Sequence, residues 1–206
     1  MMMRYSAGFT KEKWSEHDIE AVINLLQKYD DKKQILDEAV EKNLFQLRSP
    51  LSIKNRFNMV YNRARTLNPE MQKMYLTAND YDRKVLVLYT FMRAYRIPLE
   101  FYQEILIYKY QQQEPLYKND FHYFFAAKAE VNETVASWRP ETIKRLISAL
   151  TLFFREAKMI EKIDDTKFDV KPIHATQSLK TYAERNCPLI YSFTVLEKVN
   201  EHEINL

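Results

Sequence analysis

The chain has 206 residues, of which 46% are hydrophobic and 29% are charged, and its formal net charge is +3. A chain of this length and composition can bury a substantial core, as one globular domain or as two small fused ones. The longest apolar run, Val85 to Met92, is interrupted by Thr90 and is far too short to cross a bilayer. Residues 1–13 lack the apolar segment of a secretory signal, so we expect a cytoplasmic protein with no membrane partner.

Only one glycine, Gly8, and one cysteine, Cys187, occur in the chain. Loops that hold the phosphates of nucleotides need glycine where the backbone approaches the ligand, so Walker A and Rossmann motifs are absent. A single cysteine excludes an internal disulfide and a cysteine zinc cluster, and it fits a reducing compartment. The shortage of glycine also disfavours β-hairpins and favours helices.

The N-terminal part of the chain predicts two short helices. Ser15, with Asp18 three residues later, resembles a capping box and is expected to begin a first amphipathic helix that ends near Tyr29. The Asp30-Asp31 pair is expected to cap a second helix that ends near Asn43.

The segment from Lys42 to Pro69 contains six basic residues and no aspartate or glutamate. These six charges exceed the net charge of +3, so the rest of the chain sums to −3. The basic residues of the segment are Lys42, Arg48, Lys54, Arg56, Arg63 and Arg65. A positive patch confined to one segment is the kind of surface that a polyanion binds.

A third helix is predicted within this segment, with Ser49 as its N-cap and Pro50 as its first residue. Its apolar residues recur at helical spacing and form one stripe, made of Ile53, Phe57, Val60, Ala64 and Leu67. The opposite face carries Lys54, Asn55, Asn58, Asn62 and Arg65, and the border of the stripe carries Arg56 and Arg63. A helix that buries one face and exposes asparagines and cations is a candidate DNA recognition helix. A solvated surface helix is the alternative, but the three exposed asparagines argue against it because Asn is a poor helix former.

These three short helices, of which the third is basic, have the order of a helix-turn-helix unit with a lengthened turn, and we assign this unit to residues 1–79. Residues 80–115 are expected to form central core helices. Asp80 is expected to cap the first of them, Arg96-Ile97-Pro98 to interrupt it, and Leu99 to Tyr110 to continue as another helix. The many aromatic residues of this segment favour core packing over a ligand pocket.

Residues 116–173 repeat the pattern of the first unit. Asn119 is expected to cap one helix, and Pro140 to stand in the first turn of a longer one. The outer side of this longer helix carries Lys144, Arg145, Ser148, Thr151 and Arg155. Arg139 stands at its N-terminus, where backbone N–H groups favour phosphate. Because Glu141 and Glu156 dilute the charge, DNA contact and plain surface are both open for this helix.

The end of the chain is less regular. Residues 159–173 are expected to form either a small β wing around an Asp164-Asp165 turn or irregular chain. Residues 174–206 form a C-terminal tail, in which we expect a helix from Thr176 to Arg185. The run LIYSFTV after Pro188 looks extended and is interpreted as a strand or a docked tail.

Four segments of the chain are informative together. They are RYSAGFT at residues 4–10, NLFQLRSPLSIKNRFNMVYNRARTLNPE at 43–70, LVLYTFMRAYRIPLEFYQEIL at 86–106, and the block from Asp120 through Trp138-Arg139 to Glu161. In this order and spacing they resemble the BrxA family of the BREX phage-defence systems. The resemblance covers residues 4–163 and implies a small helical protein with two helix-turn-helix units that bind double-stranded DNA. The first helix has His17 and Glu20 where the family often has arginines, so no backbone contact is expected from it.

These observations together predict an all-α, compact helical fold with two helix-turn-helix-like units around an aromatic helical core. The predicted function is non-enzymatic binding of double-stranded DNA as an accessory protein of a BREX-type system. The residues expected to contact DNA are Arg48, Ser52, Lys54, Asn55, Arg56, Asn58, Asn62, Arg63, Arg65, Arg139, Lys144, Arg145, Ser148 and Arg155.

Two other interpretations of the same charges stay open. One is a protein–protein adaptor that docks its basic helices on an acidic partner, and the other is binding of structured RNA. The four histidines stand far apart in the sequence, so we predict no metal site, cofactor or catalytic group. We expect a monomer whose partners are duplex DNA and other BREX subunits.

Overall fold

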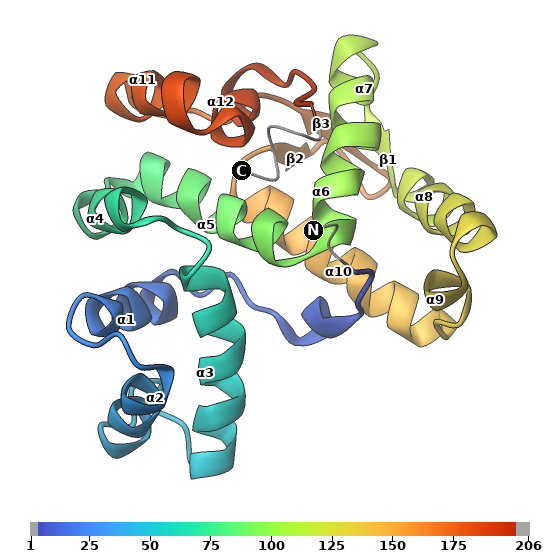
Figure 1. Ribbon diagram of the computed structural model, residues 1–206. Helices are drawn as coiled ribbons and strands as arrows, with labels where there is room; N and C mark the ends of the chain where they lie inside the picture. Colours follow the sequence, from blue (N-terminus) through green and yellow to red (C-terminus); the bar gives the residue numbers. More distant parts are fainter. Residues whose placement is uncertain (1–3, 201–206) are drawn as a thin grey trace.

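The computed structural model describes residues 4–200 and consists mostly of helices (Figure 1). The first half contains the 3-10 helix η1 (Gly8–Lys11), α1 (Glu16–Leu26), α2 (Lys32–Glu41), α3 (Pro50–Ala64), α4 (Pro69–Thr77), α5 (Asp80–Ala94), α6 (Arg96–Phe101), the π-helical η2 (Tyr102–Leu106) and α7 (Ile107–Gln111). The second half contains β1 (Leu116–Tyr117), α8 (Lys118–Val131), α9 (Glu133–Ala136), α10 (Pro140–Glu156), β2 (Ile160–Lys162), β3 (Lys167–Val170), α11 (Gln177–Asn186) and α12 (Pro188–Val195). The mostly helical fold predicted from the sequence is therefore confirmed.

The starts of the first two helices are held by different kinds of contact. Asp31 caps α2 as predicted, since its carboxylate accepts a hydrogen bond from the backbone N–H of Gln34 at 3.0 Å. Ser15 precedes α1 but its side chain does not cap the helix, so that prediction is wrong. Ser15 has a left-handed backbone with a φ of 50°, and its hydroxyl accepts a hydrogen bond from Arg56 instead. A tertiary contact has thus replaced the local cap.

The basic helix α3 follows its sequence prediction closely. It begins after Ser49, whose hydroxyl oxygen accepts a hydrogen bond from the backbone N–H of Ser52 at 3.2 Å. Its apolar stripe is buried, with Phe57 fully inaccessible, whereas Asn58 and Asn62 are exposed. The stripe packs against both α1 and α2, so the predicted phase of the helix is confirmed.

Helix α5 runs through the middle of the molecule (Figure 1) and contacts α1, α3, α4, α6, α10 and α12. Neighbours on all sides explain why the run from Val85 to Met92 is buried at every position. The side chain of Asn79 caps this helix by accepting a hydrogen bond from the backbone N–H of Asp82 at 3.0 Å. The predicted cap at Asp80 is therefore wrong by one residue.

Aromatic packing joins the central helices to the rest of the protein. An extended Tyr95, with φ of −137° and ψ of 133°, separates α5 from α6. The predicted interruption at Arg96-Ile97-Pro98 is therefore misplaced, because these three residues begin α6. The ring of Phe101 stacks on Phe121 of α8 with centroids 4.6 Å apart, and Tyr102 meets Phe193 of α12 edge-on at 5.2 Å. These rings belong to one buried cluster that contains residues from each of the four predicted ranges, namely 1–79, 80–115, 116–173 and 174–206. The prediction of core packing for this segment is confirmed.

A small antiparallel sheet flanks α10, with strand order β1-β3-β2. Ile160 pairs with Val170 across the predicted Asp164-Asp165 turn, so the β wing, one of the two alternatives for this segment, is present. The pairing of Leu116 in β1 with Phe168 was not predicted, because a strand of two residues leaves no period in a sequence. The predicted Asn119 cap is wrong, because α8 begins at Lys118.

The C-terminal segment forms two helices. The first is α11, which confirms the helix predicted from Thr176 to Arg185. The hydroxyl of Thr176 caps it by accepting a hydrogen bond from the backbone N–H of Leu179. The run after Pro188 is α12 rather than a strand, so the prediction of an extended segment is wrong. Ile190 and Phe193 are buried at helical spacing, and the helix packs on α11 and α5. Among residues 4–200, no helix combines the length and the apolar character needed to cross a membrane.

Candidate nucleic-acid interface

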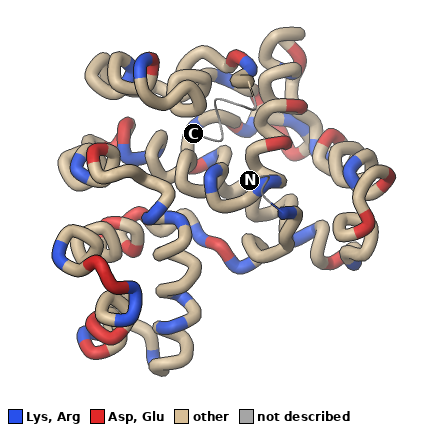
Figure 2. Tube along the Cα trace, in the orientation of Figure 1, with Lys and Arg blue, Asp and Glu red and all other residues tan. Residues whose placement is uncertain are grey.

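The outer face of α3 is exposed and free of acidic residues, and it is polar except for Leu51, which is 68% exposed. The predicted residues that are exposed on the helix are Ser52, Lys54, Asn55, Asn58 and Asn62, and Arg48 and Arg65 are exposed next to its two ends. Figure 2 shows basic but no acidic residues along α3, whereas the neighbouring α1 and α2 carry several acidic ones. The acidic residues at this end of the molecule lie on α1 and α2, so the outer face of α3 carries only positive charges.

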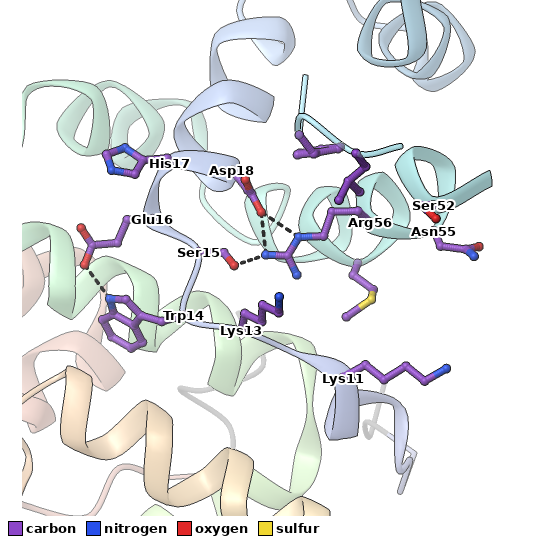
Figure 3. Close-up of a pocket in the computed structure, with 13 residues that line it drawn as sticks. Lys11, Lys13, Trp14, Ser15, Glu16, His17, Asp18, Ser52, Asn55 and Arg56 are labelled. Atoms are coloured by element: carbon purple, nitrogen blue, oxygen red, sulfur yellow. Dashed lines mark hydrogen bonds and ion pairs between the residues drawn. The ribbon is translucent and has the colours of Figure 1, made fainter. Parts of the chain in front are cut away.

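Arg56 differs from the prediction, because its charge is compensated within the protein. Its side chain is only 13% exposed, and its Nε donates to the carboxylate of Asp18 at 2.7 Å. Its Nη2 donates to the hydroxyl of Ser15 (Figure 3). Arg56 thus ties α3 to the start of α1, and it is poorly suited to hold a phosphate.

Arg63 is fully buried, so the prediction that it contacts DNA is wrong. Its guanidinium forms an ion pair with Glu12 at 3.3 Å and donates to the backbone oxygen of Lys13 at 3.1 Å. It also donates to the hydroxyl of Thr90 at 3.2 Å and lies 4.8 Å from the ring centroid of Phe153. Burial lowers the pKa of Arg63, and the adjacent Glu12 carboxylate acts in the opposite direction.

The burial of Arg63 could not be predicted from the local sequence pattern. It borders the apolar stripe of α3, and border positions are usually exposed. The segment from Glu12 to Trp14, far away in the sequence, covers that border in the folded protein. The long-range contact therefore decided the burial of this arginine.

Two lysines that were not predicted to contact DNA lie beside α3. Lys11 and Lys13 are exposed and line a cleft of about 670 Å³ between the N-terminal segment and α3. In Figure 3 they lie on one side of this cleft, and Ser52, Asn55 and Arg56 lie on the other. No local pattern could have indicated them, because about forty residues separate them from α3.

A second cationic surface lies on α10. All five predicted residues are exposed there, namely Arg139, Lys144, Arg145, Ser148 and Arg155. Within residues 4–200, none of the four cations has an ion-pair partner. Glu141 and Glu156 are exposed on the same helix, so its field is weaker than that of α3, as the sequence indicated. The wing adds little, because Lys162 pairs with Asp165 at its tip.

The N-terminal segment lies between α3 and α10 (Figure 1). Helix η1 contacts α10, and the guanidinium of Arg63 on α3 packs on Phe153 of α10. On α1, the carboxylate of Glu20 forms an ion pair with Arg83 at 3.0 Å. The two cationic helices are therefore held in one fixed relation by buried contacts.

Residues 4–200 contain no group of three or more acidic, histidine or cysteine side chains that could hold a metal ion. The fold and the surface define a mainly helical protein that presents two cationic helix faces.

The chain belongs to the BrxA family, because the BrxA family model matches residues 3–186. It is also similar to the BREX protein BrxA of Bacillus cereus (strain H3081.97), with 27% identity over 130 residues. That match covers 63% of this chain and 65% of the relative, slightly less than two thirds of its length. A crystal structure of an uncharacterized protein from Magnetospirillum magneticum has the same fold, with a TM-score of 0.79 and 14% identity. The superposition covers 95% of this chain and 100% of that chain.

Proposed function

We propose that this protein binds double-stranded DNA as a non-enzymatic accessory protein of a BREX-type phage-defence system. The observation that carries the proposal is the outer face of α3, which presents cations and asparagines without any acidic residue. Membership of the BrxA family and the similarity to a BREX protein support the place in phage defence.

The arrangement of the helices supports this proposal. Helix α3 packs its apolar stripe on α1 and α2 and turns its polar face outward, as the recognition helix of a helix-turn-helix unit does. Helices α8, α9 and α10 followed by the β2–β3 hairpin have the order of a helix-turn-helix unit with a wing. The protein thus offers two helices that can each enter a DNA groove.

The residues on α3 suit two different tasks. Lys54 and Arg65 are positioned to bind phosphates, which supplies affinity without sequence preference. Asn55, Asn58 and Asn62 have amide groups that can bind the N6 and N7 edge of adenine in the major groove. We therefore assign phosphate binding to the cations and contacts to base edges or backbone oxygens to the asparagines.

The binding of duplex DNA is expected to weaken steeply with salt. The log–log slope should be about −0.9 per phosphate neutralised, so four to seven contacts imply a loss of roughly a hundredfold or more between 50 and 200 mM salt. Fluorescence anisotropy with a labelled random duplex measures this slope. A flat response, or no binding at low salt, would contradict the proposal.

A competition experiment separates DNA from the alternatives. An RNA duplex of matched length that competes as well as DNA would indicate RNA binding, because phosphates alone do not distinguish the two. A protein that ignores both duplexes would instead favour an adaptor role toward an acidic partner.

Charge reversal in either cationic helix is expected to cost most of the affinity if both helices bind one duplex. The two variants are Lys54→Glu with Arg65→Glu on α3, and Lys144→Glu with Arg145→Glu on α10. Linked contacts to one ligand reinforce each other, so the loss of one set should remove more than half of the binding. The α3 variant should bind duplex DNA more weakly than the α10 variant, because α3 carries no acidic residue that reduces its positive field.

A matched control for this experiment is Lys28→Glu with Lys33→Glu. Both of these lysines are exposed near Asp30 and Asp31, and the change in net charge is the same. Circular dichroism verifies the fold of each variant. If the α10 variant binds as the control does while the α3 variant fails, α10 is ordinary surface.

A further inference from the structure

The N-terminal segment beside α3 alternates between exposed and buried side chains. Lys11 and Lys13 are exposed, and Glu12 between them is only 5% exposed. The backbone at Glu12 is extended, with φ of −67° and ψ of 145°, so neighbouring side chains point to opposite sides. The segment therefore presents Lys11 and Lys13 on the side opposite to the buried Glu12, which anchors it.

This anchor holds the segment firmly. The Glu12 carboxylate accepts hydrogen bonds from the Tyr95 hydroxyl at 2.6 Å and from Arg63 at 3.3 Å. Arg63 also donates to the backbone oxygen of Lys13 at 3.1 Å. Phe9, at the preceding η1, is fully buried and packs edge-on against Phe91 at 5.4 Å. Phe9 before the two lysines and Glu12 between them are thus fixed to the core.

The lysines form one wall of a cleft and α3 forms the other (Figure 3). Trp14, Phe45 and Met59 also line it. The two acidic groups of the cleft are already engaged, since Asp18 pairs with Arg56 and Glu16 accepts a hydrogen bond from the indole of Trp14. Lys11 and Lys13 have no ion-pair partner within residues 4–200, and their two positive charges outnumber the one carboxylate of the cleft without an ion pair, that of Glu16.

A recognition helix in the major groove has a sugar–phosphate backbone on each side of it. A segment that runs beside such a helix meets one of these two backbones. We infer that residues 11–15 are the second wall of the DNA site, where Lys11 and Lys13 bind phosphates of the strand that lies in the cleft beside α3. This inference rests on the proposed function.

The test is the salt dependence of duplex binding by the variant Lys11→Ala with Lys13→Ala. Each phosphate-binding lysine contributes about 1 to the salt slope, so the slope should decrease by roughly 2. The affinity at about 100 mM salt should fall on the order of tenfold or more. The variant Lys11→Gln with Lys13→Gln should behave in the same way, because it removes the charges and keeps most of the side-chain length.

The matched control is Lys28→Ala with Lys33→Ala, which removes the same charge from another exposed surface and should keep the wild-type slope. A second measurement uses the unaltered protein. Bound duplex should protect Lys11 and Lys13 from reductive methylation, detected by mass spectrometry, while Lys28 and Lys33 stay reactive.

The outcomes separate this inference from the proposed function. If the wild-type protein binds duplex DNA, the α3 variant does not, and the Lys11/Lys13 variants keep the wild-type slope, the second wall is refuted and the proposed function stands. If the wild-type protein does not bind duplex DNA at all, both are refuted. A smaller slope in the Lys11/Lys13 variants, with the wild-type slope kept in the Lys28/Lys33 control and protection of Lys11 and Lys13 by bound duplex, supports the inference.

Discussion

Replacing Glu12 by Gln is expected to lower the free energy of unfolding by about 3 kcal/mol. The substitution leaves Arg63 charged and fully buried without its carboxylate partner, and breaking a buried ion pair in this way usually costs about 3–5 kcal/mol. We expect the lower end of that range, because the backbone oxygens of Lys13 and Val87 still accept hydrogen bonds from the guanidinium. Urea unfolding followed by circular dichroism measures the change.

A double variant shows whether the stranded charge is the cause. When Glu12→Gln is combined with Arg63→Met, the buried cation is gone and a side chain of similar length fills part of its space. This double variant should be more stable than Glu12→Gln alone, because an apolar replacement of a buried pair is often tolerated. Equal or greater destabilisation in the double variant would show that packing, rather than charge, dominates at this site.

The second large effect is expected at the apolar stripe of α3. Phe57→Ala should lower the free energy of unfolding by about 3–5 kcal/mol, because Phe57 is fully buried and its loss leaves a cavity. The ring of Phe57 also lies 5.2 Å from that of Tyr61, so the neighbouring side chain loses a contact. Thermal and urea unfolding both report the change.

The neighbouring residue is the control for this prediction. Asn58 is exposed, so Asn58→Ala should be neutral or slightly stabilising, because Ala is the better helix former. A strong loss of stability in Asn58→Ala, or none in Phe57→Ala, would contradict the packing of α3 on α1 and α2.

The buried arginine connects stability to the proposed function. Arg63 holds the segment that carries Lys11 and Lys13, and it packs on α10 through Phe153. A cation that looked like a ligand for DNA is thus an internal link between the two cationic helices. Its guanidinium is buried and holds these elements together, so it is not accessible to a phosphate.

Local sequence patterns determined the regular elements around the site. The phase of α3 follows from apolar residues at helical spacing, and its start follows from Ser49 before Pro50, since both act within a few residues. Asp31 was predicted as a cap for the same reason. The family resemblance was likewise readable from the sequence, and the BrxA family match confirms it.

Only the tertiary structure decided which cations are available. Arg63 and Arg56 lie on the border of a stripe, where the sequence cannot show whether another segment covers them. The N-terminal segment covers Arg63, Asp18 neutralises Arg56, and the same fold brings Lys11 and Lys13 to the cleft. The run after Pro188 became α12 for a similar reason, because burial against α5 and α11 outweighed its β-type composition. Local patterns specify helices and caps through neighbouring residues, whereas the exposure of a border residue depends on contacts between segments far apart in the chain.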